Sequence, residues 1–173
     1  MIVAMGILMF GLLSLAAAMG WSLSISKRLG YMTDTKLTIS SMLEQMETLR
    51  NTRRLTFGQI ANQGDVNNVG ATLAFAGFPR GFQPVSANPG PDGIYGTADD
   101  LVDAGTDAVY GTNDDFVNPA LARPRYTREI LITSLSSNLR KIQVTMRYPG
   151  SNGEIQQLMG VSYLNNDAAS NFR

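Results

Sequence analysis

The 173-residue chain contains no cysteine and no histidine. Without cysteine it forms no disulfides and offers no thiolate ligands, and without histidine it lacks the commonest general base and a usual zinc ligand. Carboxylate or Ser–Lys chemistry remains open, but this composition argues against an enzyme. The formal net charge of zero gives no overall attraction to nucleic acid, and no specific nucleic-acid partner is predicted.

The start of the chain also lacks charge and proline. No charged residue precedes Lys27, and no proline precedes Pro79. Residues 1–26 therefore include the roughly 20 apolar residues that a helix needs to cross a bilayer core. A secretory signal peptide would begin with basic residues, so an anchoring or assembling helix fits this segment better. The segment carries small residues that allow close approach between helices. They are Ala4, Gly6, Gly11, Ala16, Ala17, Ala18 and Gly20.

The helix is expected to continue beyond the apolar segment as an amphipathic stretch, residues 27–58. Apolar residues recur there at three-to-four spacing, and Lys36 fills one of the expected positions. The apolar positions are Ile25, Leu29, Met32, Ile39, Leu43, Met46 and Leu49. The pattern predicts one helix to about Arg54, weakened at Gly20 and Gly30, with a length on the order of 75 Å. Its second half should pack one stripe on a domain.

The last third of the chain, residues 126–173, reads as an antiparallel β-sheet. Strands are predicted at 126–133, 139–148 and 154–164, with turns between them and a frayed tail at 165–173. The second strand alternates cleanly, and its apolar face is Ile142, Val144, Met146 and Tyr148. A three- or four-stranded meander would lie with one face on the amphipathic helix half. The predicted fold class is α+β, with a long N-terminal helix packed on a small antiparallel sheet.

Residues 59–125 are predicted to be a loop-rich region, with a short strand at Thr72–Phe75. The region contains a tandem repeat: DGIYGTADD at 92–100 recurs as DAVYGTNDD at 107–115. Each copy has the form D-x-x-Y-G-T-x-D-D. Seven of the chain's fourteen acidic residues lie between Asp92 and Asp115, and no lysine or arginine occurs from Gln83 to Ala122. So many carboxylates repel one another unless a cation or solvent relieves them.

Calcium suits such a loop because it takes six to eight oxygen ligands in flexible geometry. A structural Ca²⁺ is therefore predicted, and its candidate ligands are Asp92, Asp99, Asp100, Asp107, Asp114 and Asp115. The alternative is a pair of Asp-capped turns in which the carboxylates bond local backbone amides. In that case the nearby arginines serve as counter-charges. They are Arg80, Arg123, Arg125 and Arg128.

Several segments resemble one bacterial family. Residues 1–8, MIVAMGIL, look like the stretch that follows the glutamate of a class III prepilin signal. Gly11–Leu15 resembles minor pilins and pseudopilins of the V and I types, and the strands at Leu139–Tyr148 and Gly160–Leu164 look like those of the same group. On these residues the chain resembles a type IV pilin or a type II secretion pseudopilin.

The resemblance implies prepilin-peptidase processing, methylation, a precursor pool in the inner membrane, and assembly with copies of itself and other pilins into an extracellular filament. The filament core would be the bundled apolar helices, through Ile2, Ile7, Leu8, Phe10, Leu12, Leu13 and Leu15. The resemblance also places the folded domain outside the cell. Lys27 and Arg28 argue weakly for the opposite, since basic residues near a span tend to stay cytoplasmic.

One position departs from the family pattern. If Met1 were the first residue of the mature protein, Met5 would stand where the family has a glutamate that pairs with a neighbouring subunit's N-terminal amine. We expect the chain to begin just after that glutamate; the alternative is a subunit that lacks it. A second functional hypothesis is a membrane-anchored calcium-binding or adhesive surface module that does not polymerise. A third, an enzyme using Asp99 and Asp100, is the least favoured, because adjacent carboxylates in a glycine-rich loop look more like ligands than an acid–base pair.

Overall fold

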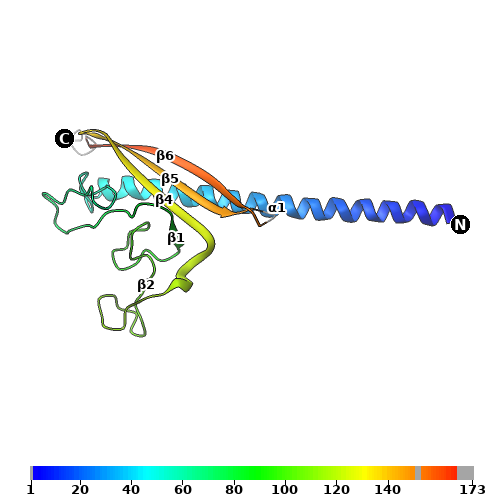
Figure 1. Cartoon of the computed structure of the whole chain (residues 1–173), viewed down its shortest axis with the longest axis horizontal. Coiled ribbons are helices and arrows are strands. Elements are labelled where there is room, and N and C mark those ends of the chain that lie inside the picture. Colours follow the sequence, from blue (N-terminus) through cyan, green and yellow to red (C-terminus); the bar gives the residue numbers. More distant parts are fainter. Residues whose placement is uncertain (1, 151–152, 167–173) are drawn as a thin grey trace.

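The computed structural model describes residues 2–150 and 153–166, and it has the predicted α+β architecture (Figure 1). One helix, α1 (Ile2–Asn51), runs the length of the molecule. Its first half projects alone, and its second half lies against an antiparallel sheet. The remaining loops lie on one side of the sheet, away from the projecting end of α1.

Helix α1 is continuous through Gly20 and Gly30, so the predicted weak points are not breaks. It ends at Asn51, three residues before the predicted end at Arg54. The buried positions of its second half follow alternating three- and four-residue steps: Thr35, Ile39, Met42, Met46 and Leu49. The assignment of Lys36 to this stripe was wrong. Thr35 occupies the position instead, because its hydroxyl is satisfied inside the helix by the carbonyl of Tyr31, at 2.7 Å.

The main sheet has four antiparallel strands in the order β1-β4-β5-β6. They are β1 (Gln83–Ser86), β4 (Ala122–Ser136), β5 (Leu139–Pro149) and β6 (Ile155–Asn165). The three predicted strands are confirmed as β4, β5 and β6, with β4 longer at both ends. A second small sheet pairs β2 (Val102–Asp103) with β3 (Phe116–Val117), and a short 3-10 helix, η1 (Pro119–Leu121), leads into β4.

One prediction about local structure fails, and one strand was missed. Thr72–Phe75 is not a strand, and the fourth strand of the sheet is β1, which the sequence did not indicate. β1 is short and carries Pro84, and it pairs only with β4, so it lies at an edge where a missing N–H is tolerated. The predicted frayed tail largely lies outside the described residues, although Asn165 belongs to β6.

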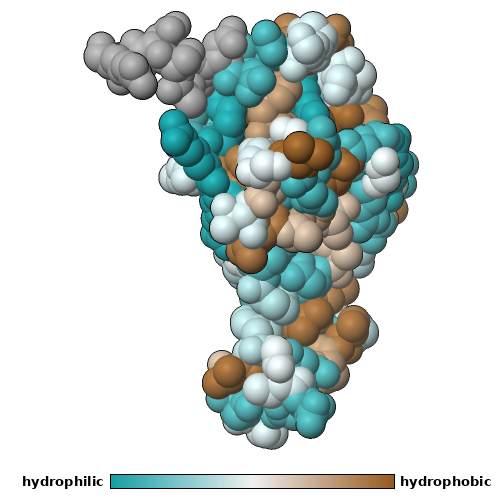
Figure 2. Space-filling model, turned by 90° about the vertical axis from the view of Figure 1, so that its left-hand side faces the viewer, coloured by the Kyte–Doolittle hydropathy of each residue, from teal (hydrophilic) through white to brown (hydrophobic). Residues whose placement is uncertain are grey.

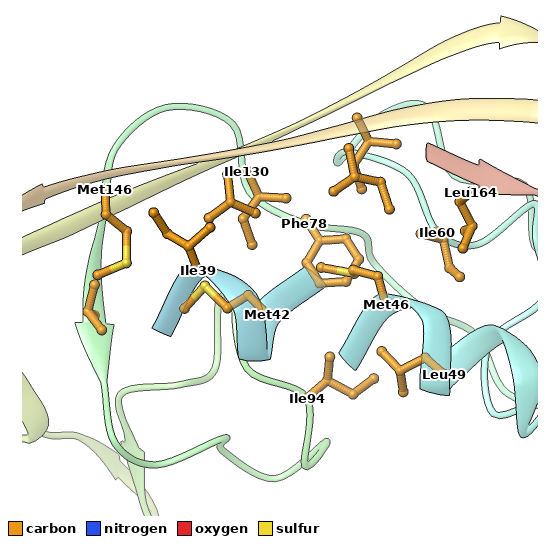
Figure 3. Close-up of a cluster of buried hydrophobic side chains, with 14 of the residues drawn as sticks. Ile39, Met42, Met46, Leu49, Ile60, Phe78, Ile94, Ile130, Met146 and Leu164 are labelled. Atoms are coloured by element: carbon orange, nitrogen blue, oxygen red, sulfur yellow. The ribbon is translucent and has the colours of Figure 1, made fainter. Parts of the chain in front are cut away.

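The core lies between the helix stripe and the inner face of the sheet (Figure 3). As predicted, Ile142, Val144, Met146 and Tyr148 of β5 are buried on one face. Thr145, assigned to the opposite face, is buried as well. The helix approaches β6 closely at Gly160, where an added Cβ would lie 2.4 Å from Cγ2 of Ile39. Side-chain bulk at that position would therefore separate the two elements.

A buried asparagine connects the loop region to the sheet. The Asn62 amide donates to the carbonyls of Ile130, at 2.7 Å, and Phe78, at 3.1 Å. Its Oδ1 accepts the backbone N–H of Ile132, at 2.8 Å. Asn62 is fully buried, and its side chain satisfies backbone groups of β4 that β1 does not pair. The loop region is thereby fixed over the core, with Ile60 and Phe78 packed beneath it.

Candidate functional site

The first candidate site is the projecting half of α1, which makes no contact with the sheet (Figure 1). Its large apolar side chains are exposed, and Phe10 and Trp21 expose 80% and 73% of their surface. All the predicted filament-core residues except Ile2, whose side chain is outside the description, belong to this exposed set. They are Ile7, Leu8, Phe10, Leu12, Leu13 and Leu15. The helix is long and apolar enough to cross a membrane.

Such a surface has a physical consequence. Folded chains in water seldom expose so large a contiguous apolar area unless a lipid or protein partner covers it. Nothing in the described chain folds back over this half of α1. The fold therefore divides the molecule into an unpartnered apolar rod and a folded domain with its own core.

The second candidate site is the acidic repeat, and its first copy is organised around the Thr97 hydroxyl. Oγ1 of Thr97 lies 2.5 Å from Oδ1 of Asp99, 2.9 Å from Oδ1 of Asp100 and 3.5 Å from Oδ1 of Asp92. The carbonyl oxygen of Ile94 is also 2.9 Å away. A hydroxyl has one proton to donate, so four acceptor oxygens converge on a single donor. The carboxylates also accept backbone N–H groups, including that of Ile94 at 2.7 Å.

The last carboxylate of the first copy is paired with an arginine of the sheet. Asp100 and Arg128 are both buried and lie 2.6 Å apart. The same guanidinium donates to the carbonyl of Pro84, at 2.7 Å, and so joins β4, β1 and the repeat. Burial lowers the pKa of Arg128, and the neighbouring Asp100 carboxylate partly opposes that shift. Of the four arginines expected as counter-charges, Arg128 alone forms an ion pair with the repeat among the described residues.

The second copy reproduces much of this hydrogen-bond pattern, but on the surface. Thr112 donates toward Oδ1 of Asp114, at 2.6 Å, and the carbonyl of Val109, at 3.1 Å. Gly111 N–H donates to Asp115, as Gly96 N–H donates to Asp100 in the first copy. The structure thus confirms the repeat as a three-dimensional unit. The first copy is built into the core, and the second is exposed.

The same pattern extends the repeat by two residues at its start. Gly90 and Gly105, two positions before the first aspartate of each copy, have φ angles of 66° and 65°. An added Cβ would lie 2.4 Å from the Asp99 carbonyl oxygen in one copy and 2.4 Å from Oδ2 of Asp114 in the other. Both glycines thus permit the same close approach. The unit is G-x-D-x-x-Y-G-T-x-D-D, and aligning the two copies over a longer window would have revealed it.

The two tyrosines of the repeat contact one common segment. The hydroxyl of Tyr95 donates to the Ala87 carbonyl, at 3.3 Å, and that of Tyr110 bonds Asn88, at 3.1 Å. The Tyr95 backbone also exchanges hydrogen bonds with the Gln45 side chain of α1, at 2.9 and 3.0 Å. Sequence reasoning missed Gln45, whose polar side chain gave no signal distinct from that of a solvated helix face.

One carboxyl in each copy has a clearly shifted pKa, and the two shifts have opposite directions. Burial, assisted by the charges of Asp99 and Asp100, raises the pKa of Asp92 to about 6 from an ordinary value of 3.8. Hydrogen bonds from Thr112 and Thr106 lower the pKa of Asp114 to about 2. Negative charge is therefore costly at Asp92 and well accommodated at Asp114.

Of the six aspartates predicted as calcium ligands, Asp92, Asp99 and Asp100 converge on the Thr97 hydroxyl. In the second copy, separate groups bond to the other three, Asp107, Asp114 and Asp115. In the part of the chain that the structure describes, no group of three or more acidic side chains is arranged to hold a metal ion. In the first copy the carboxylates converge on a hydroxyl and on backbone N–H groups instead. This arrangement agrees with the alternative prediction of Asp-capped turns. The carboxylates supply oxygen ligands of the kind that calcium prefers, but these oxygens already accept hydrogen bonds from the protein.

The fold and these sites define an α+β protein with one candidate membrane-spanning helix and an acidic, twice-repeated loop. Comparison with known proteins adds no closer assignment, because no family model, curated protein or solved structure matches the chain.

Proposed function

We propose that this protein is a structural subunit of a type IV pilus-like extracellular filament, assembled through the apolar half of α1. The single observation that carries the proposal is the continuous helix whose first half is apolar, exposed and unpartnered while its second half belongs to a folded domain. In this proposal the protein waits in the inner membrane. It then joins a bacterial filament with copies of itself and other pilins.

The driving force for assembly differs between water and lipid. A fully buried leucine or phenylalanine contributes about 1.5–3 kcal/mol relative to water. Subunits that leave a bilayer gain less, since lipid tails are as apolar as leucine, and close packing must contribute. Gly6 and Gly11, where an added Cβ would meet nothing within the monomer, leave room for a neighbouring helix.

The proposal is tested with Leu12→Asp in cells that carry the assembly machinery. A carboxylate in the packed helix bundle should abolish filaments in sheared surface material viewed by electron microscopy. The matched control is Leu73→Asp, at another exposed leucine, in the loop region, which should leave filaments intact. Both variants should keep the parent's thermal unfolding. Normal filaments from Leu12→Asp would refute the role proposed for the helix.

A second candidate function is a membrane-anchored, calcium-binding or adhesive surface module that does not polymerise. The excess of acceptor oxygens around Thr97 favours it, because a cation would relieve the repulsion between Asp92, Asp99 and Asp100. In the second copy Asp107, Asp114 and Asp115 would be the ligands. The bound ion would supply positive charge and hold the loop in one conformation.

Calorimetric titration of the full chain in detergent with CaCl₂ tests the calcium component. Saturable heat and a raised melting temperature are expected, with both reduced in Asp99→Asn. Absence of heat and of any shift in melting temperature would remove calcium from the proposal. Filaments in the electron micrographs separate the two functions whatever the calcium result.

A further inference from the structure

Three arginines lie together where α1 ends. Arg50 is in the last turn of α1, and Arg53 and Arg54 come shortly after the end of the helix at Asn51. All three line one surface cavity of about 310 Å³, together with Thr56, Thr72 and Asn166. This end of α1 is opposite the projecting apolar end (Figure 1), and Figure 2 views the molecule from this side.

Within residues 2–150 and 153–166, no carboxylate forms an ion pair with an arginine of this cavity. Among the described residues, ion pairs use Arg80, Arg123 and Arg128, and none uses the three arginines of the cavity. Arg50 and Arg54 donate to neutral oxygens, the backbone carbonyls of Asn165 and Asp92. The C-terminal end of a helix carries only about half a negative charge, so three guanidinium groups outweigh it.

Arg53 is placed at a conformational cost. Its φ angle is 59°, in the left-handed region that glycine adopts freely and that helices often use just after their end. An arginine there strains the backbone, and its side chain forms no hydrogen bond or ion pair with any described residue. Folding therefore gives no reason for arginine rather than glycine at this position. Residues held in this region are concentrated at functional sites, and the guanidinium of Arg53, which no described residue engages, is available to a ligand.

We propose that this cavity binds the phosphate groups of a multiply charged anion. Guanidinium groups present planar, paired donors that match phosphate oxygens, and Thr56 and Thr72 also line the cavity. Phosphate could arrive as a free polyphosphate or as the backbone of a nucleic acid. The site does not depend on polymerisation, and it lies far from the segment that would enter a bilayer.

The test uses the full chain in non-ionic detergent and calorimetric titration with inorganic tripolyphosphate, with a short single-stranded DNA oligomer as a parallel arm. Arg53→Gly removes one guanidinium and relieves the backbone strain. It should weaken binding at least about tenfold, as expected for loss of a charge-assisted hydrogen bond. The same variant should melt at a higher temperature than the parent, so loss of binding is not confused with loss of fold.

The matched control is Arg125→Gly. Arg125 is also an exposed arginine with a left-handed φ angle, 67°, but it lies at the start of β4 and outside this cavity. Its replacement removes the same charge and should leave binding unchanged. Binding of tripolyphosphate alone identifies a small anion, and tighter binding of the oligomer identifies a polymer backbone. The proposal is overturned if neither probe binds, if Arg53→Gly binds as the parent does, or if Arg125→Gly weakens binding equally.

Discussion

At the scale of single residues, the pairing of Arg128 with Asp100 makes the first repeat part of the core. Both side chains are buried, and the guanidinium also holds the β1 carbonyl of Pro84. A buried ion pair adds little net stability over apolar residues of the same volume, yet breaking it is costly because one charge is left unpaired. The pair therefore specifies where the loop sits more than it strengthens the fold.

Arg128→Met tests this interpretation. Loss of the guanidinium leaves the Asp100 carboxylate buried, and the free energy of unfolding should fall by about 3–5 kcal/mol. Arg80→Met removes an exposed ion pair with Asp65 and should cost no more than about 1 kcal/mol. Chemical denaturation of the full chain in detergent measures both. Equal losses in the two variants would contradict the assigned role of Arg128.

Asp92 gives a pH dependence of opposite sign to that of most carboxylates. Its pKa is about 6 in the folded chain and near 3.8 when unfolded, so the folded state binds more protons between these values. The contribution of Asp92 to the free energy of unfolding is therefore largest below pH 4. It falls as the pH rises to 6 and stays at its lowest value above pH 6.

Asp92→Asn keeps the acceptor for the Ile94 N–H and removes the charge. Above pH 6 it should therefore stabilise the fold by on the order of 1 kcal/mol, a figure discounted for the half-exposed position of Asp92. The gain should disappear below pH 4. Melting curves from pH 3 to 8 in EDTA measure this, with Asp107→Asn, the equivalent exposed position, as the control. A gain that is independent of pH would refute the electrostatic explanation.

At the scale of elements, the helix and the sheet meet through a glycine. Gly160 of β6 lets Ile39 approach so closely that a Cβ would lie 2.4 Å from the Cγ2 atom. Gly160→Ala should push α1 from β6 and cost about 1–3 kcal/mol, as overpacking does. Gly30→Ala, at an exposed helical position with nothing within 4 Å, should instead stabilise by up to about 1 kcal/mol. Thermal unfolding of both variants distinguishes the two effects.

The elements also show what the sequence could predict. Helix α1 and strands β4, β5 and β6 carry strong periodic patterns, and each was predicted to within a few residues. β1 is four residues long and contains Pro84, so its sequence gives no strand signal, and long-range pairing with β4 forms it. Thr35 was missed for a related reason. A threonine can satisfy its hydroxyl within the helix and then be buried like an apolar residue.

Within the candidate site, the sequence predicted the grouping of the aspartates but not their partners. The repeat fixed which residues belong together, because each copy folds through local bonds such as that from Gly96 N–H to Asp100. The distant partners Arg128 and Gln45 depend on how the loop docks onto β4 and α1, which local sequence does not encode. The arginine cavity at the end of α1 likewise requires the meeting of three separate segments.

At the scale of the whole molecule, the apolar rod and the folded domain should be independent. The first buried side chain of α1 is that of Thr35, and the core begins at Ile39. Removal of residues 1–26 should therefore leave the midpoint of thermal unfolding within about 1 °C of the parent's in detergent, because additivity holds for parts that share no contacts.

The shortened chain should stay monomeric in plain buffer, whereas the full chain is expected to self-associate there through its exposed apolar segment. Sedimentation of both chains without detergent measures this difference. A shortened chain that unfolds or aggregates would show that the apolar segment supports the fold.

The exposed second repeat has a consequence for how this protein can change over evolutionary time. Its turn closes on itself through Thr112 and Gly111, while the first is locked to the sheet by Arg128. A module that folds mainly through its own local hydrogen bonds can be duplicated, deleted or exchanged with little effect on the core. Differences in length among related chains should therefore accumulate in the second repeat, while the helix and the sheet are preserved.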